Sequence, residues 1–291
     1  ANLIDLGVST VSGTYTVTAS AGNITDSGTL AITGLATFTT STSGAEIELD
    51  QTGSTFAAGV SLNTTGSSGN ATVDTGTNAL ILATSSVGGD LTLTSGNASG
   101  ITDNGTVTVL GDLDLETDAN NGEIDMGTLA VSGEIELDTV VVSNAGTAQA
   151  GSTTTITLAS GASTTDDFYN SMSVYISDDT GSGQVRAISD YVGSTRVATV
   201  STWGTQPDNT SVYEVRSSFG DATVVNTTSL DFESAVVGGD FVATATNGAI
   251  TQDGALKIAG TSTFTTSATG ADITLSTATN DFIGAVSFTT A

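Results

Sequence analysis

The chain has 291 residues, of which 31 are acidic and four are Lys or Arg, so its formal net charge is −27 at neutral pH. Such a polyanion repels phosphate backbones and anionic headgroups, which excludes nucleic acid as a partner and disfavours a membrane surface. Cysteine and histidine are both absent, which excludes disulfides, thiol chemistry and imidazole metal sites.

The segment 4–65 at the start of the chain occurs twice more. A copy near the C-terminus matches it at a constant offset of 226 residues, which pairs Ile24 with Ile250 and Phe38 with Phe264. A second copy begins 76 residues after the first and contains one inserted residue, so that Ile24 matches Ile101. Self-similarity at a fixed period of this length indicates a solenoid built from stacked repeats.

Inside each repeat, apolar residues alternate with Thr, Ser or an acid, as in Leu30-Ala31-Ile32 and Leu91-Thr92-Leu93. A period of two indicates strands with one buried face, and the Gly, Asn, Asp and Ser residues between the runs supply turns. Because one coil of a β-solenoid takes roughly 20 to 30 residues, the sequence predicts an all-β parallel β-helix with about three coils per 76-residue repeat. A β-sandwich explains the short strands but not the period.

Residues 146–219 break the pattern. This segment holds Trp203, Pro207, four of the five Tyr and three of the four basic residues. Its alternating runs still indicate strands, so we predict a small, separately folded all-β domain inserted at a turn of the solenoid, where insertions are tolerated. The expected organisation is two repeats of parallel β-helix over 1–145, the inserted domain over 146–219, and the third repeat over 220–291.

Two resemblances add to this prediction. The segments 248–256, 270–275 and 280–282 resemble the right-handed β-helices of filamentous-haemagglutinin-type adhesins and related bacterial surface proteins. Segments 156–162 and 166–170, with 180–186 and 190–191, make the insert similar to a small β-module of phage tail and bacterial surface proteins. The first resemblance implies a right-handed solenoid that serves as a stalk. The second implies no catalytic residues.

Three runs place carboxylates at every second position: Glu46, Glu48 and Asp50; Asp112, Asp114 and Glu116; Glu134, Glu136 and Asp138. On a strand these side chains project from one face, and several carboxylate oxygens are what a hard cation such as Ca²⁺ requires. The alternative is a solvated outer face that keeps the β-surface soluble and unpaired. We therefore expect no cofactor, with Ca²⁺ as the cation to test.

The aromatic and basic residues of the insert are the candidate ligand-binding residues: Trp203, Tyr169, Tyr175, Tyr191, Arg186 and Arg196. Aromatic faces stack on sugar rings, and Arg hydrogen-bonds hydroxyl groups, so these residues could form a glycan-binding surface. The alternative is that a domain of this size uses its large aromatics for its own core.

Catalysis is not expected, because Lys257 is the only basic residue of the repeats and the carboxylates recur as ladders instead of forming one distinct pair. No run of 18 apolar residues occurs, so we expect no membrane insertion. The leading hypothesis is a structural segment of a long extracellular fibre or adhesin stalk at the cell surface, with copies or adjacent repeats stacked end to end. The alternative is a glycan- or receptor-binding adhesin, or a phage tail-spike-like module, on a β-helical spacer.

Overall fold

The computed structural model describes residues 3–119, 121–216 and 220–291, and within these ranges every regular element is a strand. The chain forms two compact units, a solenoid made of Ala1–Thr139 with Gly220–Ala291 and an inserted unit, Val140–Phe219. The insert begins before the predicted residue 146, because the strand Val142–Thr147 pairs with a strand of the inserted unit. The other predicted boundary, residue 219, lies outside the described ranges. No helix of the described part is long and apolar enough to cross a membrane.

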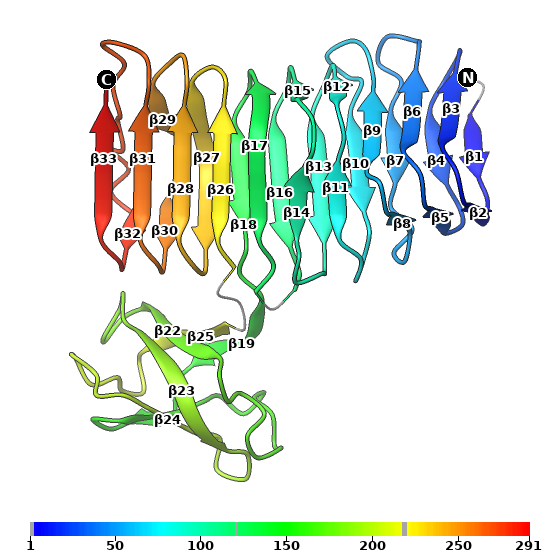
Figure 1. Ribbon diagram of the computed structural model, residues 1–291. Coiled ribbons are helices and arrows are strands. Elements are labelled where there is room, and N and C mark those ends of the chain that lie inside the picture. The colour runs from blue at the N-terminus through cyan, green and yellow to red at the C-terminus, as the bar shows by residue number, and fades with distance from the viewer. Residues whose placement is uncertain (1–2, 120, 217–219) are drawn as a thin grey trace. The chain divides into compact units, whose positions relative to one another are not determined.

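The solenoid strands follow one another in chain order as β1 (Ile4–Leu6), β2 (Ser9–Val11), β3 (Tyr15–Ala19), β4 (Ile24–Asp26), β5 (Leu30–Ile32), β6 (Ala36–Thr40), β7 (Ile47–Leu49), β8 (Thr55–Phe56), β9 (Val60–Asn63), β10 (Ala71–Asp74), β11 (Leu80–Leu82), β12 (Ser85–Val87), β13 (Leu91–Ser95), β14 (Ile101–Asp103), β15 (Val107–Val109), β16 (Leu113–Thr117), β17 (Ile124–Val131), β18 (Ile135–Asp138), β26 (Ala222–Asn226), β27 (Leu230–Val237), β28 (Phe241–Ala245), β29 (Ile250–Gln252), β30 (Leu256–Ile258), β31 (Ser262–Thr266), β32 (Asp281–Phe282) and β33 (Val286–Thr290). All pairings between them are parallel and join one coil to the next (Figure 1).

The strands stack into two facing sheets, one of 11 and one of 12 strands, and the second short strands of the first repeat form a separate sheet, β2-β5-β8. Most coils contain two short strands followed by a longer one in the facing sheet, as β4, β5 and β6 do, whereas a single eight-residue strand, β17 or β27, replaces the short pair in two coils. The register places like residues over each other, with Leu91 beside Leu113 and Leu93 beside Leu115. The predicted parallel β-solenoid is therefore confirmed.

The long strands change sides between repeats. In the first repeat β3, β6 and β9 lie in the 12-stranded sheet; in the second, β13, β16 and β18 lie in the 11-stranded sheet; in the third, β28, β31 and β33 return to the 12-stranded sheet. The change occurs because a second long strand follows directly at each junction, β10 after β9 and β26 after β18. Each of the first two repeats thus has the expected three coils and a further half-turn.

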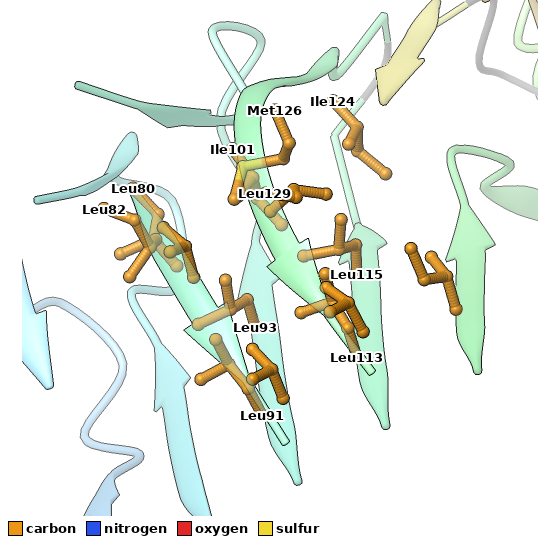
Figure 2. Packing of buried hydrophobic residues seen from close by; sticks show 14 of the residues in the cluster. Leu80, Leu82, Leu91, Leu93, Ile101, Leu113, Leu115, Ile124, Met126 and Leu129 are labelled. Atoms are coloured by element: carbon orange, nitrogen blue, oxygen red, sulfur yellow. The ribbon is translucent and has the colours of Figure 1, made fainter. Parts of the chain in front are cut away.

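Inward-facing apolar side chains from both sheets fill the space between them and form one continuous core (Figure 2). Figure 2 shows Leu93 and Leu115 stacked on one another, with Ile101 and Leu129 among their neighbours. The period-two alternation accounts for this core, since every second residue of a strand faces inward.

The core continues past the insertion. Residues 124 and 126 of β17 pair with Ala222 and Val224 of β26, and β18 pairs with β27. The Thr139 hydroxyl donates a 2.9 Å hydrogen bond to the Gly220 carbonyl, so the chain leaves and rejoins the solenoid at one turn.

The inserted unit is built from β19 (Val142–Thr147), β20 (Ala150–Gly151), β21 (Thr155–Thr157), β22 (Ser173–Asp178), β23 (Val185–Val192), β24 (Val197–Val200) and β25 (Val212–Arg216). They form one antiparallel sheet in the order β19-β25-β22-β23-β24-β21-β20. β19 and β20 stand at the two ends of this order, yet they are consecutive in the chain and flank the buried Ala148; we call this inserted unit the barrel.

Candidate functional site

The aromatic residues that the sequence suggested as a ligand surface are all buried, and three of them, Trp203, Tyr169 and Tyr191, belong to the apolar core of the barrel. The exposed fraction is 5% for Trp203, 2% for Tyr169, 6% for Tyr175 and 1% for Tyr191. The rings of Tyr169 and Tyr191 meet edge to face at 4.8 Å, and the Tyr191 hydroxyl donates to the Ser163 carbonyl at 2.6 Å. The expectation of an exposed stacking surface is thus corrected, because a barrel of this size needs these rings for its own interior.

The two predicted arginines are half-buried and hold loops of the barrel. The Arg186 guanidinium lies 5.6 Å from the centre of the Trp203 ring, and its Nε donates to the Thr202 carbonyl at 3.0 Å. Arg196 Nε donates to the Ala162 carbonyl at 3.3 Å. The backbone carbonyls of a loop without strand pairing need hydrogen-bond donors. The two arginines supply such donors, so both side chains have a structural role.

The sequence analysis did not single out Arg216. It is 8% exposed, forms a 2.8 Å ion pair with Glu214, and places its guanidinium 4.0 Å from the centre of the Tyr175 ring. The alternation Val212-Tyr213-Glu214-Val215-Arg216 gave no signal for a buried charge. This charge lies beside a carboxylate and an aromatic face, the two partners that compensate it.

Gln184, which the sequence analysis also missed, organises the loop that carries Trp203. Its Oε1 accepts hydrogen bonds from the backbone N–H of Gly204 at 2.7 Å and of Thr205 at 2.9 Å, and its Nε2 donates to the Thr205 carbonyl at 2.8 Å. This one amide satisfies three loop groups, so the loop around Trp203 is held by the side chain and needs no strand partner.

Phe168 is the large aromatic that the barrel does expose to solvent, with 52% of its surface accessible. It sits in a tight turn whose neighbour Asp167 has a φ of +62° and donates its N–H to the Tyr191 carbonyl at 2.9 Å. The ring touches Tyr169 edge to face at 4.9 Å. Sequence alone cannot separate the adjacent Phe168 and Tyr169, because only the turn decides which ring points outward.

Replacing Trp203 and Phe168 by alanine is expected to separate a core role from a surface role. Trp203→Ala should destabilise the barrel by about 3–5 kcal/mol, since it leaves a cavity, whereas Phe168→Ala should change its stability by less than about 0.5 kcal/mol. Hydrogen–deuterium exchange over residues 140–216 is the measurement, with the solenoid amides as the internal control. Equal protection in the two variants would contradict the core role of Trp203.

The acidic runs form a ladder on the outer face of the 11-stranded sheet. Asp114 of β16 pairs with Glu136 of β18, and Glu116 pairs with Asp138. The four carboxylates line a shallow hollow of about 210 Å³. The pKa of Asp114 is raised mainly by partial burial and, to a smaller extent, by repulsion from Glu136. The pKa of Glu116 is raised mainly by partial burial and, to a smaller extent, by repulsion from Asp118 and Asp138.

The flanking carboxylates of these runs brace the coils or face solvent. Asp112 Oδ1 accepts from the Glu134 N–H at 2.9 Å, and Glu46 Oε2 accepts from Asn23 Nδ2 at 3.2 Å. Glu48, within β7, and Asp50, directly after it, are exposed. Across residues 3–119, 121–216 and 220–291, no group of three or more acidic side chains has the arrangement of a metal site. The carboxylates of this acidic outer face are exposed or half-buried.

A family model of repeats of unknown function, DUF5649, matches residues 1–63, 68–126 and 220–289. The chain belongs to the DUF5649 repeat family. Each of the three matched segments overlaps one repeat of the solenoid, and the barrel lies outside them. No curated protein and no solved structure matches the chain. The DUF5649 match supports a repeat architecture and does not show kinship with filamentous-haemagglutinin-type adhesins.

Proposed function

We propose that this chain is a stiff structural segment of an extracellular fibre or adhesin stalk, and that the solenoid displays the barrel. The observation that carries the proposal is the continuity of the solenoid across the insertion. Both ladders of backbone hydrogen bonds and the apolar core run from the second repeat into the third. A rod interrupted by a folded domain keeps its stiffness only if its core does not depend on that domain.

The surface of the solenoid suits a spacer. Lys257 is the one basic residue among the repeats, and the acidic ladder of β16 and β18 faces outward. Like charges on neighbouring rods repel, and acidic side chains discourage the lateral pairing that exposed β-surfaces invite. This repulsion between neighbouring rods supports our proposal that the solenoid displays the barrel outside the cell.

The last strand of the described solenoid supports end-to-end stacking. All residues of β33 are exposed, and Phe288 stacks on Phe264 at 5.6 Å while 56% of its own surface stays accessible. An open parallel edge with an apolar side chain accepts another coil. We propose that a second copy or an adjacent repeat supplies this coil.

Sedimentation of the segment 1–291 is expected to show association that increases with concentration, because the β33 edge pairs with another coil. Phe288→Asp should weaken this association at least tenfold, since a carboxylate then faces the incoming core. Val192→Asp, a change at an exposed apolar side chain of the barrel, is the control. A single concentration-independent species, or equal weakening by the control, would contradict the stacking proposal.

Single-molecule pulling tests the mechanical role. With pulling handles at its two ends, the 80-residue insert Val140–Phe219 should lengthen the tether by roughly 280 Å when it unfolds, and it should unfold at a lower force than the solenoid held by handles at the solenoid's own ends. The solenoid resists because its parallel strands share load across two sheets, whereas the barrel is small. If the solenoid opened at lower force than the barrel, the rod proposal would fail.

A second candidate function, recognition of a glycan or receptor by an adhesin or tail-spike-like module, is favoured by the exposed Phe168. A flat ring held on a tight turn offers an apolar face for stacking. A glycan array probed with the full chain, its Phe168→Ala form and its Val192→Ala form would test this role. Signals lost only in Phe168→Ala would support it, and an array without signals would exclude glycans as the ligand.

A further inference from the structure

A threonine closes the turn after several long strands of the solenoid. Its hydroxyl donates a hydrogen bond to the carbonyl five residues later. These bonds join Thr40 to Ala45 at 3.0 Å, Thr117 to Gly122 at 3.2 Å, Thr266 to Ala271 at 3.3 Å, and Thr64 to Gly69. In each case four residues form the turn and the threonine links the strand end to the start of the next strand.

The barrel is inserted at a turn of this kind. The bond from the Thr139 hydroxyl to the Gly220 carbonyl, 2.9 Å long, has the same donor and acceptor, but 80 residues instead of four lie between them. The threonine bond therefore fixes the two ends of the turn whatever the length of chain between them.

Four hydrogen bonds, the threonine bond and three others, hold the ends of the β9–β10 turn and also hold the turn that carries the barrel. We call these four bonds the frame. The three others are formed by matching residues at the two turns. At the β9–β10 turn, Gly88 N donates to the Thr64 hydroxyl at 3.0 Å, Gly89 N to Gly69 O at 3.1 Å, and Asp90 N to Asn70 Oδ1 at 2.9 Å. At the turn that carries the barrel, Gly238 N donates to the Thr139 hydroxyl at 3.0 Å, Gly239 N to Gly220 O at 2.9 Å, and Asp240 N to Asp221 Oδ1 at 2.7 Å.

The residues of the β9–β10 turn are mostly outside this frame. Thr65, Ser67 and Ser68 are exposed. Thr65 is the residue to retain, because its carbonyl accepts a 2.7 Å bond from the Gly44 N–H of the previous coil. Beyond Thr65 the chain can leave the solenoid and return at Gly69 with the four frame bonds intact, as it does between Thr139 and Gly220.

We infer that the β9–β10 turn, which in this chain has four residues, is a second position at which this solenoid accepts a folded domain. The inference rests on the proposed display role and extends it. The β9–β10 turn passes from the 12-stranded to the 11-stranded sheet, whereas the β18–β26 turn passes in the reverse direction. Because strands within a sheet are parallel, the two turns lie at opposite edges of the solenoid (Figure 1).

Two grafts and one excision test the inference in the full chain. The first graft replaces Gly66–Ser68 by a second copy of 141–219. The control graft places the same copy between Ala83 and Thr84, at the corner of β11 and β12, where Ala83 is buried and its N–H donates to the Val60 carbonyl at 2.8 Å. The excision replaces 140–219 by the sequence of the β9–β10 turn, Thr-Gly-Ser-Ser.

The graft at the β9–β10 turn should give a monodisperse protein whose solenoid amides keep the parent's exchange protection to within about twofold, and the excised protein should do the same. The control graft should lose protection in β9, β11 and β12 by at least a hundredfold or aggregate. Failure of the first graft, or equal success of the control graft, would overturn the inference. Because these readouts concern folding, such a failure would leave the mechanical role of the solenoid to its own pulling experiment.

Discussion

Phe241→Ala is expected to lower the stability of the solenoid by about 4 kcal/mol, within the range measured for large aromatic truncations in cores. Phe241 is fully buried and stands between Phe232 and Phe264, with ring centres 5.5 Å and 5.6 Å away in edge-to-face arrangements. Its removal leaves a cavity and breaks two aromatic contacts, each of which adds roughly 0.5–1.5 kcal/mol to burial. Neighbouring coils cannot close the gap, because the backbone ladder fixes their spacing.

Denaturant unfolding of the excised rod or of the full chain, followed by far-UV circular dichroism, measures this loss. Phe288→Ala is the matched control, since Phe288 belongs to the same ladder of rings but is 56% exposed. The control should lose less than about 1 kcal/mol, because only part of its area leaves water on folding. Equal losses in the two variants would contradict a continuous core at Phe241.

Asp26→Asn is expected to stabilise the protein by about 2 kcal/mol at pH 8. Asp26 faces inward at the end of β4, is 6% exposed, and accepts a 3.0 Å hydrogen bond from the Asp50 N–H through Oδ1. Its Oδ2 is buried without a hydrogen-bond partner among the described residues. Burial, with a smaller contribution from Asp50, raises the pKa of Asp26 from 3.8 to about 6.

The pH dependence follows from this raised pKa. Between pH 4 and pH 6 the folded protein holds a proton on Asp26 that the unfolded chain has released, so stability falls as pH rises through this window and levels off above it. The amide of the Asp26→Asn variant has no charge to bury, and its oxygen can still accept from the Asp50 N–H. The advantage of the variant should therefore be largest above pH 6 and shrink towards pH 4.

Thermal unfolding at pH 4, 6 and 8 tests the prediction, with Glu48→Gln, an exposed carboxylate of the neighbouring strand β7, as the control for lost charge. The third repeat supports the substitution, since Gln252 stands at the position equivalent to Asp26. Gln252 exchanges two 2.8 Å hydrogen bonds with Asn280. A pH-independent difference between Asp26→Asn and the parent would contradict a buried, protonated carboxyl.

Much of the solenoid could be predicted from the sequence. The alternation in Leu91-Thr92-Leu93 predicted an inward Leu and an outward Thr, and both leucines are fully buried in the structure. The repeat period predicted stacking of like residues, because parallel coils bring equivalent positions into register. The foreign composition around Trp203 predicted a separate β-domain, but not its first strand, since β19 has little apolar content and resembles a turn.

The candidate sites were less predictable. Aromatic composition places Trp203 and Tyr169 in the insert, yet only the folding of the barrel decides that both rings face inward and Phe168 outward. The pairing of Asp114 with Glu136 likewise depends on which coils are neighbours. Burial and charge proximity are properties of the packed chain, and a spacing in sequence does not contain them.

The sequence by itself determined that this protein is an all-β solenoid, because a period of two fixes which side chains face inward and a 76-residue period fixes what recurs. Only the tertiary structure decided that the repeat ends half a turn out of phase. A second long strand, β10 after β9 or β26 after β18, moves the following repeat to the opposite sheet. The alternation of apolar and polar residues predicts which face of a strand is buried. It does not predict which sheet the strand joins, because both sheets bury an apolar face of the same kind, and the sheet is decided only when the coils stack.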